Sequence, residues 1–510
     1  MFQVQRCDGA RPTCQQCIKA NTPAECVYGQ GAELSGIQML EDRISRLQGR
    51  IAFLESNTAG PVLLHDPYAQ PRQTQPTQVT AERRVLPPTT TQALLRSFSS
   101  GASQVGFFLH VSRFLQRTSA LPLSELPRHV STLLNAVYLL GAYFSTDTDS
   151  QNLQTDMLAY TLEDLSSTLV DLHPPAIMDV LQAEVLLAYY FFSNNRTVEG
   201  VYHMDAASAI VLASRLHQIR SARYAAVAGG TASRYQLAPP VDAIDEGQRI
   251  NAFWMTFILD RNWSLALGRT PVLTDDEPRG TEIDTPWPRC IETYETDPLP
   301  EGVRNLRTVQ TFLYDPIFSN DAHNPLAMHS KAAALYSAAA RIAAQFGTMP
   351  NTFPTGWQSL DHRVAEFQLV LPAADHIHPR RRDLLIKILL INLLVHGATI
   401  ELHQPLEVQG NGIVPNSRSL AAALAAANVL GRMNIGSIVH VDPIIGFLLA
   451  SVARILKRAL VSLRQNAAAH GSNEENNLLV SLAHIRFAFE TWGQRNAYIR
   501  KYLSPFLFIV

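Results

Sequence analysis

The sequence predicts an all-α fold, and three observations support this prediction. From about Gln92 onward, apolar residues recur at intervals of three and four, the spacing of helices with one buried face. A shorter series with the period of a coiled coil precedes that region. Strands of alternating polarity joined by Asn-Gly turns are not evident, so we expect no sheet. Four segments are predicted: a cysteine-rich module at 1–30, a coiled-coil helix at 34–55, a disordered linker at 56–91 and a large helical domain at 92–510.

The N-terminal module contains four of the five cysteines of the chain. These are Cys7, Cys14, Cys17 and Cys26, and the middle two form a Cys-x2-Cys pair. Thiolates bind zinc tetrahedrally, and such a pair can hold one ion from a tight turn. A surface loop with incidental thiols is the alternative. The clustering predicts that these four cysteines are zinc ligands.

The intervals of six, two and eight residues between these cysteines, with Asp8-Gly9 and Arg11-Pro12 in the first interval, resemble the second half of a fungal zinc binuclear cluster (Zn2Cys6). In that family six cysteines hold two zinc ions, and the cysteines here match the third to the sixth. The resemblance therefore implies a partial cluster that holds at most one zinc ion in this chain. The two other cysteines would precede Met1, so we expect the gene to encode Cys-x2-Cys and several Lys or Arg upstream.

The same resemblance implies double-stranded DNA as a partner, contacted here by Arg6, Arg11 and Lys19. The two positions that read bases in the family are occupied by Gln3 and Val4. From the N-terminus through the predicted coil, six basic side chains are balanced by six acidic ones. DNA affinity depends largely on cations that displace condensed counterions. We therefore expect DNA binding by this chain to be weak or absent.

The heptad series predicts a parallel homodimer, because Ile at every a position with Leu at every d position favours two parallel strands. A single amphipathic helix packed on its own domain is the alternative, because the series spans fewer than three heptads. Members of the resembled family place two clusters on paired half-sites, with the segment before the coil setting the spacing. The predicted dimerisation residues are Ile37, Leu40, Ile44, Leu47, Ile51 and Leu54.

Composition limits the remaining possibilities. The segment 56–91 contains six prolines interleaved with Gln and Thr, which predicts a disordered tether. The first residues lack the apolar stretch of a signal peptide, and the cysteine usage is typical of a reducing compartment. The most apolar run, Leu384–Ile400, is interrupted by Lys387, Asn392 and His396. These polar groups favour a buried helix, so we expect no membrane association.

The region after the linker predicts a succession of helices joined by polar loops. The proline-rich stretch 270–302 is predicted to cross the helical body as ordered coil, with Cys290 as an inert thiol. The predicted helices span 129–145, 153–171, 176–193, 198–218, 245–267, 326–346, 383–403, 418–434, 443–465 and 476–502.

Within this body, Phe253, Trp254 and Phe257 follow helical spacing and are predicted to be buried. Asp260-Arg261 is predicted to form a structural ion pair. Gly268-Arg-Thr-Pro271 then ends the helix. The pattern Arg…Phe-Trp…Asp-Arg…Gly-Arg-Thr-Pro resembles the signature of the fungal-specific transcription factor domain, with Thr270 as a departure. Two further segments, Ala213 to His217 and Leu393 to Pro405, resemble parts of the same domain.

Catalytic motifs are not evident: the sequence has no Walker motif, no Gly-x-Gly-x-x-Gly and no Gly-x-Ser-x-Gly. Asp375-His376-Ile-His378 is a metal-site fragment or, by preference, an inter-helix loop. The adjoining Arg380 to Arg382 is a nuclear import signal or a surface patch. We therefore expect no enzyme.

The resemblances imply a nuclear, sequence-specific DNA-binding transcription regulator of RNA polymerase II genes. It would bind DNA as a dimer through its Zn2Cys6 cluster, and its helical domain would be regulatory, with the transcription machinery as a partner. Two alternatives remain. One is a regulator without autonomous DNA binding that acts by dimerisation. The other is an α-helical enzyme without a recognisable motif.

Overall fold

The computed structural model describes a short N-terminal stretch and most of the helical region. The described residues are 8–19, 44–45, 48, 86–119, 125–223, 234–275, 279–315, 324–348, 355–372, 381–409, 412–413, 417–465 and 472–504. The chain divides into two compact units, Met1–Arg84 and Val85–Val510. The first contains α1 (Gln15–Lys19), and the second contains the other named helices.

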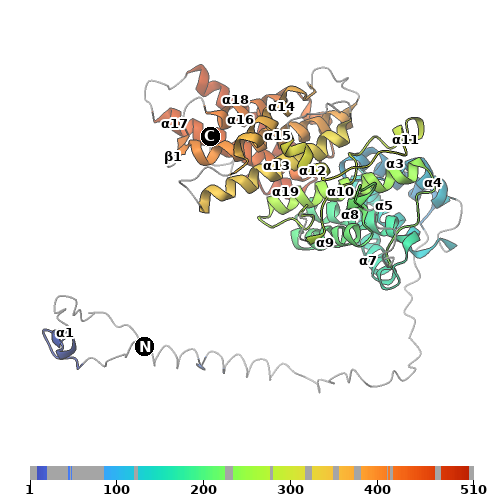
Figure 1. Ribbon diagram of the computed structural model, residues 1–510, viewed down its shortest axis with the longest axis horizontal. Coiled ribbons are helices and arrows are strands. Elements are labelled where there is room, and N and C mark those ends of the chain that lie inside the picture. Colours follow the sequence, from blue (N-terminus) through green and yellow to red (C-terminus); the bar gives the residue numbers. More distant parts are fainter. Residues whose placement is uncertain are drawn as a thin grey trace. The chain divides into compact units, whose positions relative to one another are not determined.

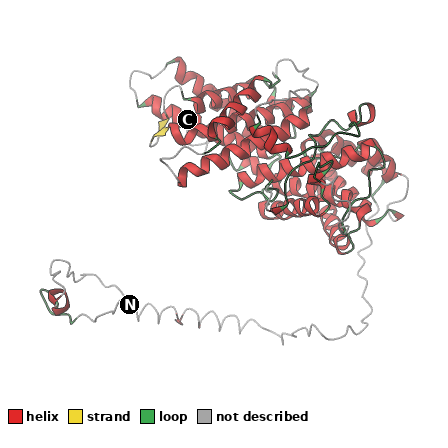
Figure 2. Ribbon diagram, in the orientation of Figure 1, coloured by secondary structure: helices red, strands yellow, loops and turns green. Residues whose placement is uncertain are grey.

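The second unit is built from helices, which confirms the predicted fold class (Figure 2). Each of the ten predicted helices has a counterpart. The long helices are α5 (Arg128–Phe144), α7 (Gln154–Val170), α8 (Ile177–Ser193), α9 (Thr197–Ala213), α10 (Ala243–Ala266), α13 (Pro325–Thr348), α15 (Arg382–Glu407), α16 (Arg418–Gly431), α17 (Ile444–Arg464) and α18 (Asn473–Trp492).

The remaining helical elements lie before, between and after these ten helices. The α-helices among them are α3 (Pro88–Gly101), α4 (Val111–Ser119), α6 (Thr148–Asn152), α11 (Thr293–Thr296), α12 (Thr308–Tyr314), α14 (Trp357–Leu369) and α19 (Ala497–Arg500). The 3-10 turns are η2 (Ala102–Gln104), η4 (Pro174–Ala176), η5 (Leu216–Gln218) and η9 (Ile435–Ser437).

Helix α10 is the central element of the second unit. In Figure 1 the helices α3 to α9 gather on one side, and α13 to α18 on the other. Helix α10 packs against α8 and α9 of the first group and against α13 and α17 of the second. Its apolar residues are therefore enclosed from both sides.

The buried face predicted for α10 is confirmed, because Phe253, Trp254 and Phe257 are each 0% exposed. The Trp254 indole stacks on Trp287, with ring centroids 4.3 Å apart, and its Nε1 donates to the Pro286 carbonyl at 2.6 Å. Both partners belong to the proline-rich stretch after α10. Where it is described, that stretch is thus ordered coil laid across the helical body, as predicted.

Two predicted helices end at least five residues earlier than expected. The helix predicted over 198–218 ends at Ala213, because Arg215 takes a left-handed conformation with φ 58°. The helix predicted over 476–502 ends at Trp492 and restarts as α19. Gly493 occupies the break, where a Cβ would lie 2.4 Å from the Phe489 carbonyl oxygen. The spacing of apolar residues does not predict helix ends that depend on the backbone of a single residue.

The helical region begins at Pro88, before the boundary expected at residue 92. Proline suits the first turn of a helix, since its missing N–H has no helical partner there. Helix α3 packs closely on α5. A Cβ at Gly141 of α5 would lie 2.3 Å from the Leu94 carbonyl oxygen, so only glycine permits this approach. The predicted linker therefore overlaps the start of the helical unit.

The expectation of no strand was wrong in one place. Strand β1 (Val408–Gln409) pairs antiparallel with β2 (Gly412–Ile413), with Gln409 opposite Gly412. The two intervening residues are Gly410 and Asn411, types favoured in two-residue hairpin loops. This pair is too small to alter the fold class.

Two of the described helical segments, Pro174–Ser193 and Arg382–Glu407, are long and apolar enough to cross a membrane. In their most apolar windows, 94% and 72% of the residues are buried inside the protein. Both segments therefore resemble core helices of a folded domain.

Buried Asp179 on α8 adds a pH-dependent term to the free energy of unfolding. Its Oδ1 lies 2.6 Å from Arg117 Nη2, yet burial raises the pKa of its carboxyl to about 6. This pKa exceeds the unfolded value of about 3.9. The contribution of the protonated carboxyl to the free energy of unfolding is therefore fully present below pH 4 and is lost as pH rises through 6. We predict that the stability of the wild type relative to Asp179→Asn falls by about 3 kcal/mol from pH 4 to 7.

Urea denaturation at several pH values measures this difference. The Nε2 of the neighbouring His129 lies 3.6 Å from Asp179 Oδ2, and burial lowers the pKa of this imidazole to about 4, so it is neutral over most of the range. A constant stability difference across the range would contradict the account of Asp179.

Candidate functional site

The described part of the N-terminal module is a loop closed by Asp8 and followed by a single helical turn. The Asp8 carboxylate accepts hydrogen bonds from the Gln15 N–H, at 3.2 and 3.3 Å, and from the Ala10 N–H at 3.4 Å. Gly9 between them has φ 69°, a conformation that glycine adopts without strain. The Asp-Gly pair thus folds the chain back and places an anion at the start of α1, where it satisfies a free backbone donor.

Two predicted zinc ligands lie together at the start of α1. Cys14 is 2% exposed, Cys17 is partly exposed, and the Cys17 N–H points to Cys14 Sγ at 3.4 Å. A spacing of three residues places both side chains on one side of a helical turn. Thiolates at a helix N-terminus are stabilised by its free N–H groups and dipole. The pair therefore presents two thiols, one of which already accepts a backbone hydrogen bond, and this donor set fits zinc.

Of the residues predicted to contact DNA, Arg11 and Lys19 are exposed and flank the thiol pair. Arg6, Cys7 and Cys26 lie outside the described residues, so the predicted set of four thiols is seen only in part. The dimerisation series is also mostly outside them. Ile44 is helical and 53% exposed, and Leu40 and Leu47 are not described.

The second candidate constellation, Asp260-Arg261 of α10, does not form the direct ion pair that was predicted. Asp260 instead accepts from the N–H groups of Val272 and Leu273 at 3.0 and 2.9 Å. Arg261 donates through Nη2 to the Leu273 carbonyl at 2.5 Å. The two side chains bind opposite polar groups of the same loop, so they hold the segment after Gly268 against α10.

Neighbouring arginines of the same motif form ion pairs, one with α9 and one within α10. Arg269 pairs with Asp205 of α9 at 2.7 Å, and Arg249 pairs with Asp245 at 2.8 Å. The motif around α10 is therefore a set of structural contacts among α9, α10 and the following loop, rather than a catalytic group.

The segment that ends in His403 and Pro405 also has a structural role. His403 Nε2 lies 2.9 Å from Asp361 Oδ1 of α14, and the other carboxylate oxygen accepts from Arg418 of α16 at 2.7 Å. Asp361 thereby links three helices. Sequence reasoning did not identify Asp361, which is distant in the chain from both partners.

Cys290 is exposed, and its Sγ donates to Glu292 Oε2 at 2.8 Å. Burial and the adjacent carboxylate raise the pKa of this thiol, which keeps it protonated and unreactive at neutral pH, as predicted. The segment Asp375 to His378 lies outside the described residues. Among the described residues, no group of three potential metal ligands comes together.

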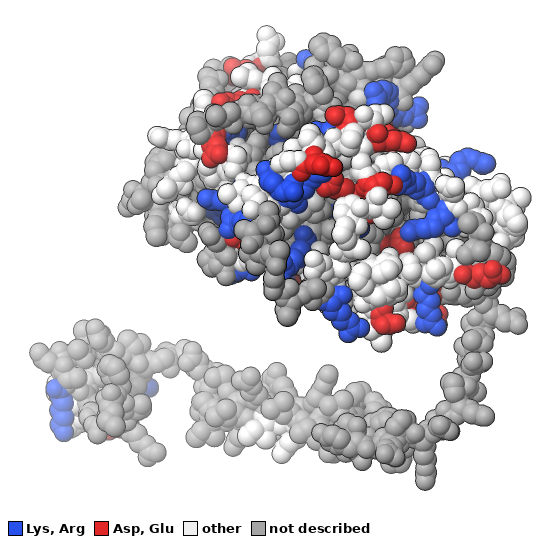
Figure 3. All heavy atoms as spheres, turned by 45° about the vertical axis from the view of Figure 1, so that its right-hand side comes forward, with Lys and Arg blue, Asp and Glu red and all other residues white. Residues whose placement is uncertain are grey.

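Acidic and basic side chains are interspersed over the face of the helical unit seen in Figure 3. On the described part of that face, the mixed charges do not form the basic stripe expected where nucleic acid binds. The helical unit therefore gives no sign, on that face, of contacting DNA.

Comparison with known families identifies both parts of the chain. Residues 4–33 match the fungal Zn(2)-Cys(6) binuclear cluster domain. Residues 95–368, more than half of the chain, match the fungal specific transcription factor domain. No curated protein matches the sequence closely enough to serve as a relative. The chain therefore belongs to the fungal transcription regulators that join a zinc-cluster DNA-binding module to a fungal specific transcription factor domain.

Proposed function

We propose that this protein acts in the nucleus as a sequence-specific regulator of RNA polymerase II genes and binds DNA as a homodimer. The observation that carries the proposal is the thiol pair at the start of α1, flanked by exposed Arg11 and Lys19. A zinc-stabilised helix turn with cations on either side can be placed in a DNA groove and held by phosphate contacts. The helical domain would transmit the regulatory signal to the transcription machinery.

In this proposal Cys7, Cys14, Cys17 and Cys26 hold the zinc. The ion supplies the folding free energy of a module that is too small to be stabilised by an apolar core. Asp8 orients the loop by accepting the Gln15 N–H, and this contact fixes where Arg11 projects. DNA binding makes and breaks no covalent bond. The zinc ligands and Asp8 serve to place the cations of Arg11 and Lys19 against phosphates.

We predict that Cys14→Ser lowers the zinc content from about one ion per chain to near zero, because a hydroxyl is a poor zinc ligand. Zinc is measured by elemental analysis of the dialysed full chain. Cys290→Ser is the matched control, since that thiol lies outside the module and donates a hydrogen bond to Glu292. Equal zinc content in the Cys14 variant and the control would exclude Cys14 as a ligand.

A second candidate function is a regulator that reaches promoters through a partner protein. The observation that favours it is the balance of six basic and six acidic side chains before residue 56, which weakens attraction to phosphates. In this candidate the coil and the helical domain carry the activity, and zinc only folds the module.

Selection from random duplex DNA with the purified, zinc-loaded full chain separates the two candidates. The proposal predicts enrichment of paired short half-sites at low salt, lost in Cys14→Ser and retained in Cys290→Ser. Affinity for the enriched site should fall steeply between 50 and 200 mM salt, as expected for phosphate contacts. If the wild type and both variants enrich no DNA sequence, the candidate that reaches promoters through a partner protein is favoured.

A further inference from the structure

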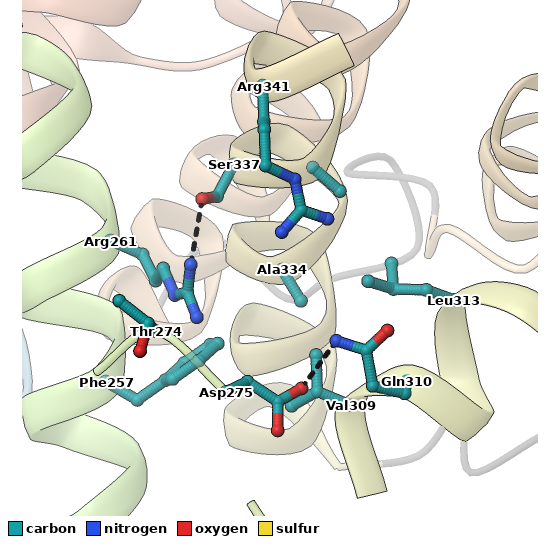
Figure 4. Close-up of a pocket in the computed structure, with 11 residues that line it drawn as sticks. Phe257, Arg261, Thr274, Asp275, Val309, Gln310, Leu313, Ala334, Ser337 and Arg341 are labelled. Carbon is teal, nitrogen blue, oxygen red and sulfur yellow. Dashed lines mark hydrogen bonds between the residues drawn. The ribbon is translucent and has the colours of Figure 1, made fainter. Parts of the chain in front are cut away.

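A cavity of about 510 Å³ lies beside the loop after α10, next to α12 and α13. It opens to solvent, since exposed Arg279, Arg307 and Arg341 line it. Figure 4 shows a smaller pocket that shares part of this lining, where Arg261 from α10 and Arg341 from α13 extend into the space between the two helices. A volume of this size accommodates a small metabolite.

The lining carries an excess of positive charge. Five arginines line the cavity (Arg223, Arg261, Arg279, Arg307 and Arg341), together with two acids, Asp275 and Glu282. Glu282 already pairs with Arg223 at 2.8 Å. The formal excess of three positive charges is gathered from segments far apart in the sequence, and it is concentrated around one opening.

The other acid, Asp275, is engaged by neutral donors. Its Oδ1 accepts from the Ile283 N–H and its Oδ2 from Gln310 Nε2, both at 2.8 Å. Its backbone is left-handed, with φ 58°, which is uncommon outside glycine. The loop is therefore built so that Asp275 binds protein amides rather than an arginine.

Nearby carboxylates attract two of the lining arginines without direct contact: Asp260 and Asp275 attract Arg261, and Asp275 attracts Arg307. Buried Arg261, 9% exposed, donates to the Leu273 carbonyl and lies 3.4 Å from Ser337 Oγ. Arg341 donates to the Tyr314 hydroxyl at 3.3 Å. Within the described ranges, neither these two nor Arg307 forms an ion pair within 4.0 Å. A buried guanidinium that no carboxylate contacts directly is costly, and a bound anion lowers that cost.

The polar groups of the lining limit what can bind. Besides the charged residues, Thr270, Thr274 and Gln310 line the cavity. A second pocket, of about 20 Å³, shares Arg261 and Arg341 with it and has room for about one water molecule. The lining of the cavity therefore suits a compact, strongly polar ligand.

We propose that this cavity binds a small oxyanion with at least two negative charges, a polycarboxylate or a phosphate compound. The planar fork of arginine matches carboxylate and phosphate oxygens in paired hydrogen bonds. A ligand there would bridge α10, the following loop, α12 and α13, and so bind a site that the DNA-binding module does not share. The claim stands whether or not the chain binds DNA.

Isothermal titration calorimetry of the full chain tests the proposal, at constant ionic strength in chloride. The two probes are propane-1,2,3-tricarboxylate and inorganic phosphate. We expect at least one probe to bind once per chain, and Arg307→Gln with Arg341→Gln to weaken it at least tenfold. The matched control, Arg96→Gln with Arg128→Gln, removes the same charge from exposed positions outside the cavity and should bind as the wild type does.

Binding of the tricarboxylate alone identifies a carboxylate ligand, and binding of phosphate alone identifies a phosphate compound. Chelation of zinc contributes equally in wild type and variants, since all retain the thiol pair. If the double variant unfolds at a lower temperature than wild type, Arg341→Gln alone, at an exposed side chain, is compared instead. The absence of heat with both probes, or equal affinity in the cavity variant, would overturn the proposal.

Discussion

Replacing Trp254 by Ala is expected to lower the free energy of unfolding by about 3–5 kcal/mol, the range for emptying a large aromatic core site. The indole is 0% exposed and stacks on Trp287 at 4.3 Å. Its Nε1 also holds the Pro286 carbonyl, which would lose its donor. The substitution therefore removes apolar contacts and loosens the coil that crosses α10.

Urea denaturation of the full chain, followed by circular dichroism, measures the loss. Phe487→Ala on α18 is the control, because this aromatic side chain is 51% exposed and its removal should cost less than about 1 kcal/mol. Similar denaturation midpoints for the two variants would mean that α10 is not the centre of the core.

Dissociation of the proposed dimer is the second large effect expected. Lysine at both Ile44 and Leu47 would place charges in the seam of the predicted coil, where each would face its counterpart in the partner helix. Burying such charges without partners costs far more than a short coil can supply. We expect the double variant to sediment as a monomer at concentrations where the wild type is a dimer.

A control for added charge is available in the same helix. Ser45→Lys with Ala52→Lys introduces two lysines at the outward b positions of the heptad, and Ser45 is exposed in the structure. This variant should remain dimeric. Dimers of unchanged stability in the seam variant would assign dimerisation to a different surface.

The sequence alone predicted the elements whose burial is periodic. The face of α10 formed by Phe253, Trp254 and Phe257 was identified correctly, because three- and four-residue spacing is a direct consequence of packing one side of a helix. Each predicted long helix is present. The breaks at Arg215 and Gly493 were missed, since the first depends on a single backbone conformation and the second on close approach of nearby backbone.

In the candidate sites too, local features could be predicted from the sequence and features that depend on tertiary structure could not. The Cys-x2-Cys pair is local, so its spacing sufficed to place Cys14 and Cys17 on one turn. Asp260 and Arg261 were identified from the sequence as structural residues. Their adjacency suggested that they pair with each other, but in the structure both bind backbone groups of the loop that follows α10. The arginine-lined cavity could not be predicted, because Arg223 and Arg341 are brought together only by the fold.

Mapping of the full chain on chromatin, with transcript levels measured after its deletion, tests the central claim that this protein is a transcription regulator. The account predicts occupancy upstream of a set of genes whose transcripts change when the protein is absent. Cys14→Ser should abolish occupancy if the zinc module contacts DNA, whereas Cys290→Ser should not. A chain that occupies no promoter and whose deletion changes no transcript would contradict the account.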